Sequence, residues 1–308
     1  MTWTILIYFS TRAQQYAEAL KPLLPECRLI ACSTEAEAAA HVAEADILLT
    51  GRFPDELYQH ATRLKWVQIA WAGIDHLLDA PLPDGCLLTR TEGLFSARMS
   101  DYTMAHILAH SIQLPRMYAN QAAHRWEHFE IGKLEGKRLG VAGAGSIGSE
   151  IARKGRAFGM EVWSLVRSPR PVAHTDRVFT PAEVDEFTAG VDYLVSTLPK
   201  TPEAIGLIDP RRMRPGALLI NVGRGITIAE EAILEAVRSH DIQAVLDVFI
   251  DEPLPPEHLF WSTPGITVTP HLSGFSVPSE VAVYFAANVR RFVASEPLVG
   301  VVDRKRGY

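Results

Sequence analysis

The segment 138–148, RLGVAGAGSIG, places three glycines in the pattern G-x-G-x-x-G at Gly143, Gly145 and Gly148. An apolar run that predicts a strand precedes the pattern, and residues 146–158, which predict a helix, follow it. In this context the glycines predict a dinucleotide-binding turn, because they permit a tight bend, close approach of a pyrophosphate and close packing of helix on strand. A glycine turn that binds no ligand is the alternative. The candidate cofactor-binding residues of the turn are Gly143, Gly145, Ser146, Ile147 and Gly148.

Short apolar runs alternate with helical stretches along the whole chain, and this alternation predicts parallel β-sheets covered by helices. The expected strands are 3–9, 29–32, 47–50, 66–69 and 87–90, then, after a long helix at 100–116, 138–142, 161–166, 193–196, 217–222, 243–247 and 267–269. We therefore expect an α/β protein with two doubly wound parallel-sheet lobes. A Rossmann cofactor-binding domain is expected at 99–278, and a flavodoxin-like substrate-binding domain at 1–98. A last helix at 279–294 is expected to return to the substrate-binding domain, which then also includes 279–308 and is discontinuous.

The 308 residues carry a formal net charge of −6 and are 47 % hydrophobic. This acidic balance argues against a nucleic-acid partner, since nucleic-acid-binding surfaces carry a basic excess; the basic run at 304–306 is interpreted as a solvated tail. Cys27, Cys32 and Cys86 have no metal-binding or redox spacing, which fits a reducing compartment. The N-terminal segment predicts a strand rather than a signal peptide, and no apolar run reaches the ~18–20 residues of a membrane span. We expect a cytoplasmic location and no membrane partner.

The end of the second strand of the cofactor domain bears on the choice of cofactor. Sites that prefer NAD place a carboxylate there to accept hydrogen bonds from the ribose hydroxyls. In this chain Val166 stands about where that acid is expected, and Arg167, Ser168 and Arg170 follow it. Guanidinium groups and a hydroxyl suit a 2′-phosphate, which an acid would repel. The sequence therefore predicts that NADP(H) is preferred and that NAD(H) is a possible second cofactor; the alternative is that both arginines are exposed loop charges.

Three later predicted strands are each followed by a chemically capable side chain: Arg224 after 217–222, Glu252 after 243–247 and His271 after 267–269. Ligands of open α/β sheets bind outside the carboxyl ends of the strands, and neighbouring parallel strands bring these ends to one edge. We therefore expect the three side chains to converge beside the dinucleotide. Taken singly, the histidine could be structural and Glu252-Pro253 an ordinary turn, whereas Arg224 between two glycines is harder to dismiss, because such a loop has little packing purpose.

These residue types suit the reduction of a 2-keto acid, in which a carbon takes a hydride and the carbonyl oxygen takes a proton. His271 is the natural proton donor because an imidazole titrates near neutral pH. Glu252, bonded to the far ring nitrogen, would orient the ring and keep it protonated. Arg224 would bind the substrate carboxylate and polarise the carbonyl group.

Several ordered motifs resemble those of the D-isomer-specific 2-hydroxyacid dehydrogenases, over essentially the whole chain. They are GAGSIG from Gly143, LPKTP from Leu198, NVGRG from Asn221, LDVF from Leu246, EPL from Glu252 and PH from Pro270. The stretch HLSGFSVP from His271, together with the arginines after the second strand, is most similar to the glyoxylate/hydroxypyruvate reductase branch. One departure is Ser100-Asp101, which stands where the family usually has a small residue and Glu.

The resemblance implies a hydride-transferring enzyme of two lobes that forms homodimers through the cofactor lobe. It assigns the catalytic roles above to Arg224, Glu252 and His271. It implies further cofactor contacts at Leu198, Pro199 and Asp247, the last to the nicotinamide amide. It implies that a loop with Trp71, Ala72 and Gly73 binds the substrate carboxylate, the backbone of the last two donating.

The sequence leaves the substrate open. A small 2-keto acid such as glyoxylate or hydroxypyruvate is favoured, a bulkier one such as pyruvate or phenylpyruvate is the second hypothesis, and a non-catalytic nucleotide-sensing protein is the third. Two histidine pairs, His106 with His110 and His124 with His128, have the i, i+4 spacing of zinc ligands. Neither pair has an obvious third ligand, so structural or surface roles are favoured and no metal is expected.

Overall fold

The computed structural model describes residues 2–304; residues 1 and 305–308, which include most of the basic run and the end of the expected substrate-binding domain, lie outside the described residues. The chain divides into two compact units: unit 1 comprises Met1–Phe95 and Ser276–Tyr308, and unit 2 comprises Ser96–Phe275. The boundaries expected at 99 and 278 lie three residues from these. Each unit is built around its own sheet.

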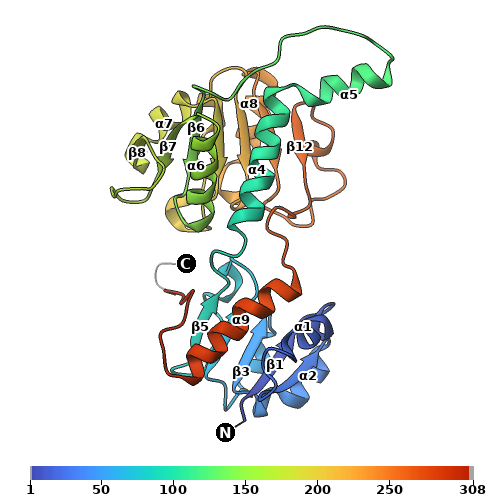
Figure 1. Ribbon diagram of the computed structural model, residues 1–308, viewed down its shortest axis with the longest axis vertical. Helices are drawn as coiled ribbons and strands as arrows, with labels where there is room; N and C mark the ends of the chain where they lie inside the picture. Colours follow the sequence, from blue (N-terminus) through green and yellow to red (C-terminus); the bar gives the residue numbers. More distant parts are fainter. Residues whose placement is uncertain (1, 305–308) are drawn as a thin grey trace. The chain divides into compact units, whose positions relative to one another are not determined.

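Unit 1 contains a five-stranded parallel sheet in the order β2-β1-β3-β4-β5, the flavodoxin-like order. Its strands are β1 (Thr4–Tyr8), β2 (Arg28–Cys32), β3 (Ile47–Thr50), β4 (Trp66–Ile69) and β5 (Leu87–Arg90), and its helices are α1 (Ala13–Leu20), α2 (Glu35–His41), α3 (Asp55–Tyr58) and α9 (Pro278–Val293). Helices α1 and α9 contact each other on one face of the sheet (Figure 1). Thus the chain returns to unit 1 after completing unit 2.

Both faces of the sheet in unit 1 are covered, which explains why its strands are continuous apolar runs rather than alternating ones. In β1, Ile5 and Ile7 belong to the core under α1 and α9, together with Phe285 of α9. Leu6, between them, points to the opposite core with Val67 of β4.

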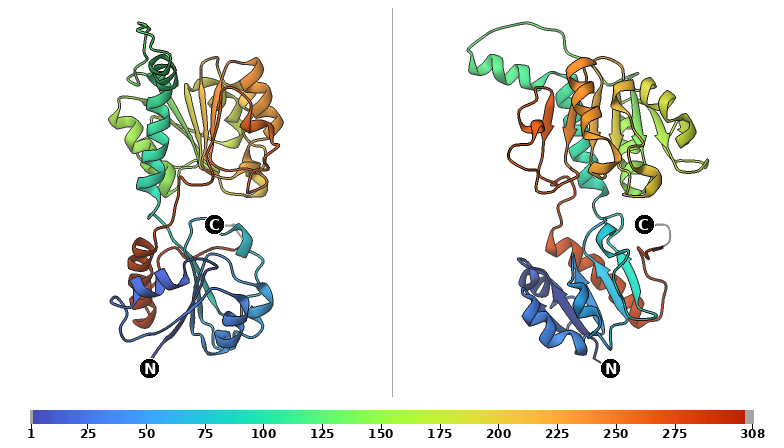
Figure 2. Two further views of the ribbon diagram at one scale, coloured as in Figure 1. Left: turned by 90° about the vertical axis from the view of Figure 1, so that its right-hand side faces the viewer. Right: turned by 180° about the vertical axis from the view of Figure 1, so that it is seen from behind.

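Unit 2 contains a seven-stranded parallel sheet in the order β12-β11-β10-β9-β6-β7-β8. Its strands are β6 (Arg138–Ala142), β7 (Glu161–Leu165), β8 (Arg177–Phe179), β9 (Tyr193–Ser196), β10 (Leu218–Asn221), β11 (Gln243–Leu246) and β12 (Ile266–Val268), and its helices are α4 (Ser96–Ser111), α5 (Leu114–Ala122), α6 (Ser146–Ala157), α7 (Val184–Gly190) and α8 (Glu230–Ser239). Helices α4 and α6 pack side by side on one face, and the view from behind shows α8 on the other (Figures 1 and 2). This is the Rossmann order with one added strand, so the predicted fold class is confirmed.

The expected long helix at 100–116 is wrong in one respect, because it is two helices. Helix α4 ends at Ser111, and Gln113 adopts a left-handed conformation with φ of 53° before α5 begins at Leu114. Pro115 lies in the first turn of α5, where its missing N–H costs nothing, but it could not have continued α4. Strand β8, which has only three residues, was not among the expected strands.

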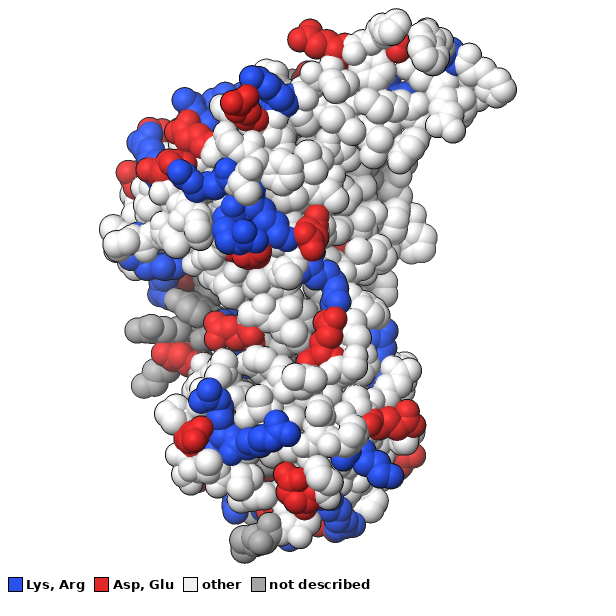
Figure 3. Space-filling model, in the orientation of Figure 1, with Lys and Arg blue, Asp and Glu red and all other residues white. Residues whose placement is uncertain are grey.

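Helix α5 and the segment after it form an arm that projects from the rest of unit 2 (Figure 1). Glu127 closes the arm on itself, since its carboxylate accepts hydrogen bonds from Arg116 at 2.6 Å and Asn120 at 2.8 Å. Trp126 is 92 % exposed and Tyr118 63 % exposed. On the face drawn in Figure 3 the arm is nearly uncharged, whereas elsewhere on unit 2 basic and acidic side chains intermingle.

Over residues 2–304, no helix combines the length and the apolar character that crossing a membrane requires.

Candidate active site

The glycine turn between β6 and α6 has the shape of a phosphate-binding cradle. Gly143 has φ of +96°, a region that other residues rarely adopt. A Cβ on Gly148 would lie 1.9 Å from the carbonyl oxygen of Gly143, so only glycine lets α6 approach the strand this closely. A Cβ on Gly145, in contrast, would meet nothing within 4 Å, because this residue faces open space.

Helix α6 begins at this turn without a protein side chain to cap it. Gly145 is the N-cap residue, and neither a side-chain cap nor an acidic residue is present in the first turn. The first amides of a helix have no partner within the helix and carry a partial positive charge, so this helix start suits an anion. Ser146 is exposed beside it and Ile147 is half-buried. The turn therefore fits the pyrophosphate of a dinucleotide.

Leu198 and Pro199 follow β9, the strand next to β6 at the point where the strand order reverses. Open α/β sheets bind ligands at such switch points. Just before these two residues, the Thr197 hydroxyl donates to the carbonyl oxygen of Gly143 at 2.8 Å. Leu198 and Pro199 thus lie beside the glycine turn.

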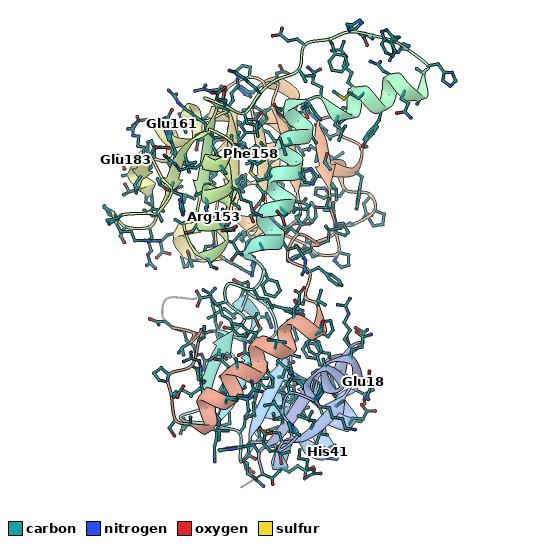
Figure 4. The ribbon with its side chains drawn as sticks, in the orientation of Figure 1. Glu18, His41, Arg153, Phe158, Glu161 and Glu183 are labelled. Carbon is teal, nitrogen blue, oxygen red and sulfur yellow. The ribbon has the colours of Figure 1, made fainter. Side chains whose placement is uncertain are left out.

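The basic segment after β7 also contacts this region. Strand β7 starts at Glu161, labelled in Figure 4, and the basic segment lies at its opposite, carboxyl end. Val166 is buried, whereas Ser168 is exposed. Arg170 donates to the carbonyl oxygen of Ala144, inside the glycine turn, at 2.9 Å, and Arg167 pairs with Glu203 at 3.2 Å. Arg170 is thereby held against the turn itself.

His271 and Glu252, which follow β12 and β11, meet directly. The distance from Nδ1 of His271 to Oε2 of Glu252 is 2.7 Å. A carboxylate can only accept, so Nδ1 carries the hydrogen and donates it, which leaves Nε2 for a reactant. The His271 side chain is 52 % exposed, so a reactant can reach the ring. The other oxygen of Glu252 accepts from the Phe249 amide at 3.0 Å, which fixes the carboxylate.

The contact between His271 and Glu252 shifts the pKa of each group in the direction that favours its charged form. The hydrogen bond to Glu252 raises the pKa of His271, against the effect of burial, and the negative charges of Glu252 and Asp247 add to this rise. Burial alone would raise the pKa of Glu252, but the hydrogen bonds from His271 and Phe249 bring it below its ordinary value. The charge of Arg224 acts on both groups: it lowers the pKa of the carboxyl group and opposes the rise at the imidazole. The arrangement is an imidazole held by a carboxylate that favours its protonated form.

Arg224 follows β10 in a loop with a glycine on either side of it. Backbone packing requires these glycines, which the sequence did not indicate. A Cβ on Gly223 would lie 2.6 Å from the carbonyl oxygen of Leu198, and one on Gly225 would lie 2.1 Å from the carbonyl carbon of Phe249. The flanking glycines are therefore required by backbone packing. The expectation that this loop has little packing purpose is wrong, although the packing also holds Arg224 next to the loops that carry Pro199 and Glu252.

Asp247, at the end of β11, lies beneath the turn that carries His271. It is fully buried, and its carboxylate accepts from the amides of Leu272 and Ser273, both at 2.9 Å, and from the Thr269 hydroxyl at 2.6 Å. His271 has φ of 49°, in the left-handed region that non-glycine residues adopt only where their surroundings hold them there. Asp247 supplies that constraint.

Tyr102 of α4 extends this hydrogen-bond network and was not predicted as a site residue. Its hydroxyl lies 2.7 Å from the Thr269 hydroxyl. Since Thr269 donates to Asp247, Tyr102 is the donor in this second bond. The contact joins residues 167 positions apart, so no local pattern could indicate it.

The loop with Trp71, Ala72 and Gly73 follows β4 in unit 1. The Trp71 ring covers Gly51, where a Cβ would lie 2.4 Å from it, and the Trp71 carbonyl oxygen accepts from Thr91 at 3.1 Å. Ala72 and Gly73 are half-buried. These contacts hold the loop backbone in one conformation.

The first histidine pair has structural surroundings, whereas His124 and His128 are exposed. The His106 ring packs edge-on against Tyr102, and the His110 ring against Tyr193. Within residues 2–304, no three His, Cys, Asp or Glu side chains gather as metal ligands would. Asp101, one of the two residues that differ from the family's usual pattern, accepts a hydrogen bond from Lys154 at 2.5 Å, which joins α4 to α6.

A glycine-lined dinucleotide turn and a carboxylate-held imidazole on one Rossmann sheet define a nucleotide-dependent oxidoreductase. The family model described as "D-isomer specific 2-hydroxyacid dehydrogenase, NAD binding domain" matches residues 104–273. The chain belongs to the D-isomer-specific 2-hydroxyacid dehydrogenase family, and the predicted class, an NAD(P)-dependent 2-hydroxyacid dehydrogenase, is confirmed.

Individual relatives agree with this assignment. Glyoxylate/hydroxypyruvate reductase A of Serratia proteamaculans is 31 % identical over 307 residues, 96 % of each chain. A family protein of Aeromonas salmonicida has 36 % identity and a TM-score of 0.90 over 99 % of this chain and 100 % of that one. An NADPH-dependent glyoxylate/hydroxypyruvate reductase of Sinorhizobium meliloti, solved with NADP and sulfate, has 30 % identity and a TM-score of 0.91 over 100 % of both chains.

Proposed function

We propose that this enzyme uses NADP(H) to reduce a small 2-keto acid of the glyoxylate or hydroxypyruvate type to the D-2-hydroxy acid. The bond between Nδ1 of His271 and Oε2 of Glu252, 2.7 Å long, carries the proposal, because it leaves Nε2 for a reactant and favours the protonated form of the ring. The relatives from Serratia and Sinorhizobium, named for these two substrates, support the substrate class.

In the proposed reaction this chain provides proton transfer, charge and orientation. Nε2 of His271 gives its proton to the substrate carbonyl oxygen, and the neutral ring then regains a proton from solvent. Glu252 keeps the hydrogen on Nδ1 and stabilises the imidazolium form. The Arg224 guanidinium binds the substrate carboxylate and stabilises the negative charge that develops on the carbonyl oxygen.

NADP(H), when bound, supplies the hydride to the substrate carbon. The residues that would hold it are Gly143, Gly145, Ser146, Ile147, Gly148, Arg167, Ser168, Arg170, Leu198, Pro199 and Asp247. The uncapped start of α6 suits the pyrophosphate, and Arg170, held against the turn, suits the 2′-phosphate. The Sinorhizobium structure with NADP supports a preference for NADP(H), with NAD(H) as the second cofactor.

In unit 1, we assign binding of the substrate carboxylate to the loop of Trp71, Ala72 and Gly73, whose backbone amides would donate. This assigns part of the substrate binding to unit 1 and the cofactor binding to unit 2, in keeping with the glycine turn in the second unit.

A panel of keto acids, followed at the nicotinamide absorbance with NADPH and NADH in parallel, tests the proposal. We expect the highest kcat/KM with glyoxylate or hydroxypyruvate and NADPH. Faster turnover of pyruvate or phenylpyruvate would favour a bulkier natural substrate. Binding of NADPH without turnover of any keto acid would favour a nucleotide-sensing protein instead.

Homodimerisation through unit 2 is part of the proposal. The exposed Trp126 and Tyr118 on the arm support it, because exposed aromatic side chains are typical of interfaces. Light scattering of the purified protein tests this: a mass of twice 34.0 kDa is expected, and a monomer at micromolar concentration would contradict it. A cytoplasmic location stays a prediction, which fractionation of cells would test.

A further inference from the structure

The structure pairs one of the two cofactor-selecting arginines with a carboxylate. Arg167 follows β7, and Glu203 lies in the short helical turn Pro202–Ala204 after β9. Their side chains meet at 3.2 Å, from NH2 of Arg167 to Oε1 of Glu203. Strands β7 and β9 flank β6 on either side, so the pair lies across the strand that leads into the glycine turn.

We propose that Glu203 is a specificity-determining residue that weakens the preference for NADP(H), because it competes with the 2′-phosphate for Arg167. The inference rests on the proposed use of NADP(H) and adds a residue that limits the selectivity.

The ion pair between Arg167 and Glu203 can separate when a group that binds Arg167 more strongly is present. The side chains of Arg167 and Glu203 are 55 % and 53 % exposed, so water can solvate both when they separate. Exposed ion pairs of this kind are weak. A 2′-phosphate carries more negative charge than a carboxylate and offers three acceptor oxygens to the planar guanidinium. Arg167 should therefore exchange Glu203 for the phosphate.

The exchange leaves Glu203 without its cation, and this lost ion pair opposes binding of NADP(H). Hydrogen bonds from its own amide and from the Thr201 side chain lower the pKa of Glu203, and the charge of Arg167 adds to this, so the carboxylate stays ionised at neutral pH. Arg170 differs, since it contacts the neutral carbonyl oxygen of Ala144. The two arginines therefore play unequal parts. Binding of NADP(H) breaks the ion pair of Arg167, whereas the contact between Arg170 and the Ala144 carbonyl oxygen involves no ion pair.

NAD(H) meets no such competition. It has no 2′-phosphate, so Arg167 can stay with Glu203 when it binds. Its ribose hydroxyls can donate hydrogen bonds to a carboxylate. The acid that usually accepts these bonds is missing, since Val166 stands in its place, so Glu203 is a carboxylate that could accept them instead. Glu203 thus penalises one cofactor and leaves the other unaffected or favoured, which accounts for a chain that prefers NADP(H) and still accepts NAD(H).

The test measures dissociation constants of NADPH and NADH by nicotinamide fluorescence for the wild type and Glu203→Gln. The amide keeps the size of the side chain and removes its charge. We expect NADPH to bind about 3- to 10-fold more tightly and NADH to bind equally or less tightly. Because salt screens the Arg167–Glu203 ion pair, the gain should shrink from about 20 mM to about 300 mM salt.

The matched control is Glu186→Gln. Glu186 pairs with Arg177 at 2.7 Å with similar exposure, 57 % and 46 %, but neither residue belongs to the proposed cofactor site. It should leave the NADPH to NADH ratio unchanged. In the background of Arg167→Gln, which itself should weaken NADPH binding, adding Glu203→Gln should give clearly less gain than in the wild type.

An unchanged ratio in Glu203→Gln, with a wild type that binds NADPH, would overturn the inference and leave the proposed function standing. An equal gain in the Arg167→Gln background would also overturn it, since the effect would not pass through Arg167. A wild type that binds NADH alone would contradict the proposed cofactor preference; a gain of NADPH binding in Glu203→Gln would then still support the inference about Glu203.

Discussion

The two units use the same kind of parallel sheet but differ at the first strand-to-helix turn. In unit 2 this turn holds Gly143, Gly145 and Gly148 and leaves the start of α6 open. In unit 1 the corresponding turn between β1 and α1 has no glycine, and Phe9 stacks on Tyr16 with ring centroids 4.2 Å apart. An aromatic ring thus packs at the turn that in unit 2 is left open. A doubly wound sheet does not by itself bind nucleotides; the residues of the turn decide.

The units also differ in how their carboxyl edges present chemistry. Unit 2 places charged side chains there, with Arg224, Glu252 and His271 after successive strands. Unit 1 offers mainly a fixed backbone, the loop at Trp71 after β4. We therefore expect substitutions at the edge of unit 2 to change kcat or cofactor binding, and substitutions at the edge of unit 1 to change mainly the KM of the keto acid.

The largest effect is expected for His271→Ala, which removes the proton donor. Reduction of glyoxylate should slow by about 10²- to 10⁴-fold in kcat, while NADPH binding, measured by fluorescence, stays within about twofold. His258→Ala is the matched control, because His258 also pairs with a glutamate, Glu230, at 3.2 Å in the same unit. Equal activities of the two variants would remove the main support for the proposed mechanism.

Gly148→Ala tests the cradle. The new Cβ would overlap the Gly143 carbonyl oxygen, so the turn must open at a cost of about 1–3 kcal/mol in stability, and NADPH should bind at least tenfold more weakly. Gly145→Ala sharpens the point, since its Cβ has room within the protein. That variant should keep the Tm of the wild type and still lose NADPH affinity. Unchanged binding in both would show that the turn does not hold the cofactor.

Glu252→Gln tests the raised pKa of His271. Reduction needs the protonated ring, so kcat/KM for glyoxylate should be constant at low pH and fall as pH rises through the pKa of His271. Glu252 raises this pKa above its ordinary value, so the variant should shift the fall toward lower pH. A shift of one pH unit corresponds to about a tenfold loss above the pKa. A pH–rate profile of the wild type and the variant checks this. If kcat/KM falls at the same pH in both, Glu252 does not raise the pKa of His271.

The smallest effect is expected in unit 1. Trp71→Ala removes the ring that covers Gly51, so the backbone of Ala72 and Gly73 should lose its fixed position. The KM of the keto acid should rise about 3- to 10-fold, whereas kcat and the KM of NADPH should change by less than about twofold. Steady-state kinetics with each substrate varied in turn separate these parameters. A loss confined to kcat would show that the loop acts differently from its assigned role.

Strongly patterned elements were predictable from the sequence at their observed bounds, among them Trp66–Ile69, Leu87–Arg90 and Arg138–Ala142. The break at Gln113 was not predicted, although Pro115, which cannot continue a helix, is a local signal for it; only the structure shows the left-handed conformation of Gln113. In the site, residue types and their places after strands were predictable. The contacts of Tyr102 with Thr269 and of Arg167 with Glu203 were not, since their partners are 167 and 36 positions apart.

The amino-acid sequence alone determined the glycine turn, the two parallel sheets and the residues at the strand ends, because each depends on neighbours within one strand, turn or helix. Only the tertiary structure decided which groups meet: that Glu252 holds His271, that Asp247 supports the histidine turn and that Arg167 has a carboxylate partner. These depend on how separate segments pack, and packing sets the distances on which hydrogen bonds and pKa values depend.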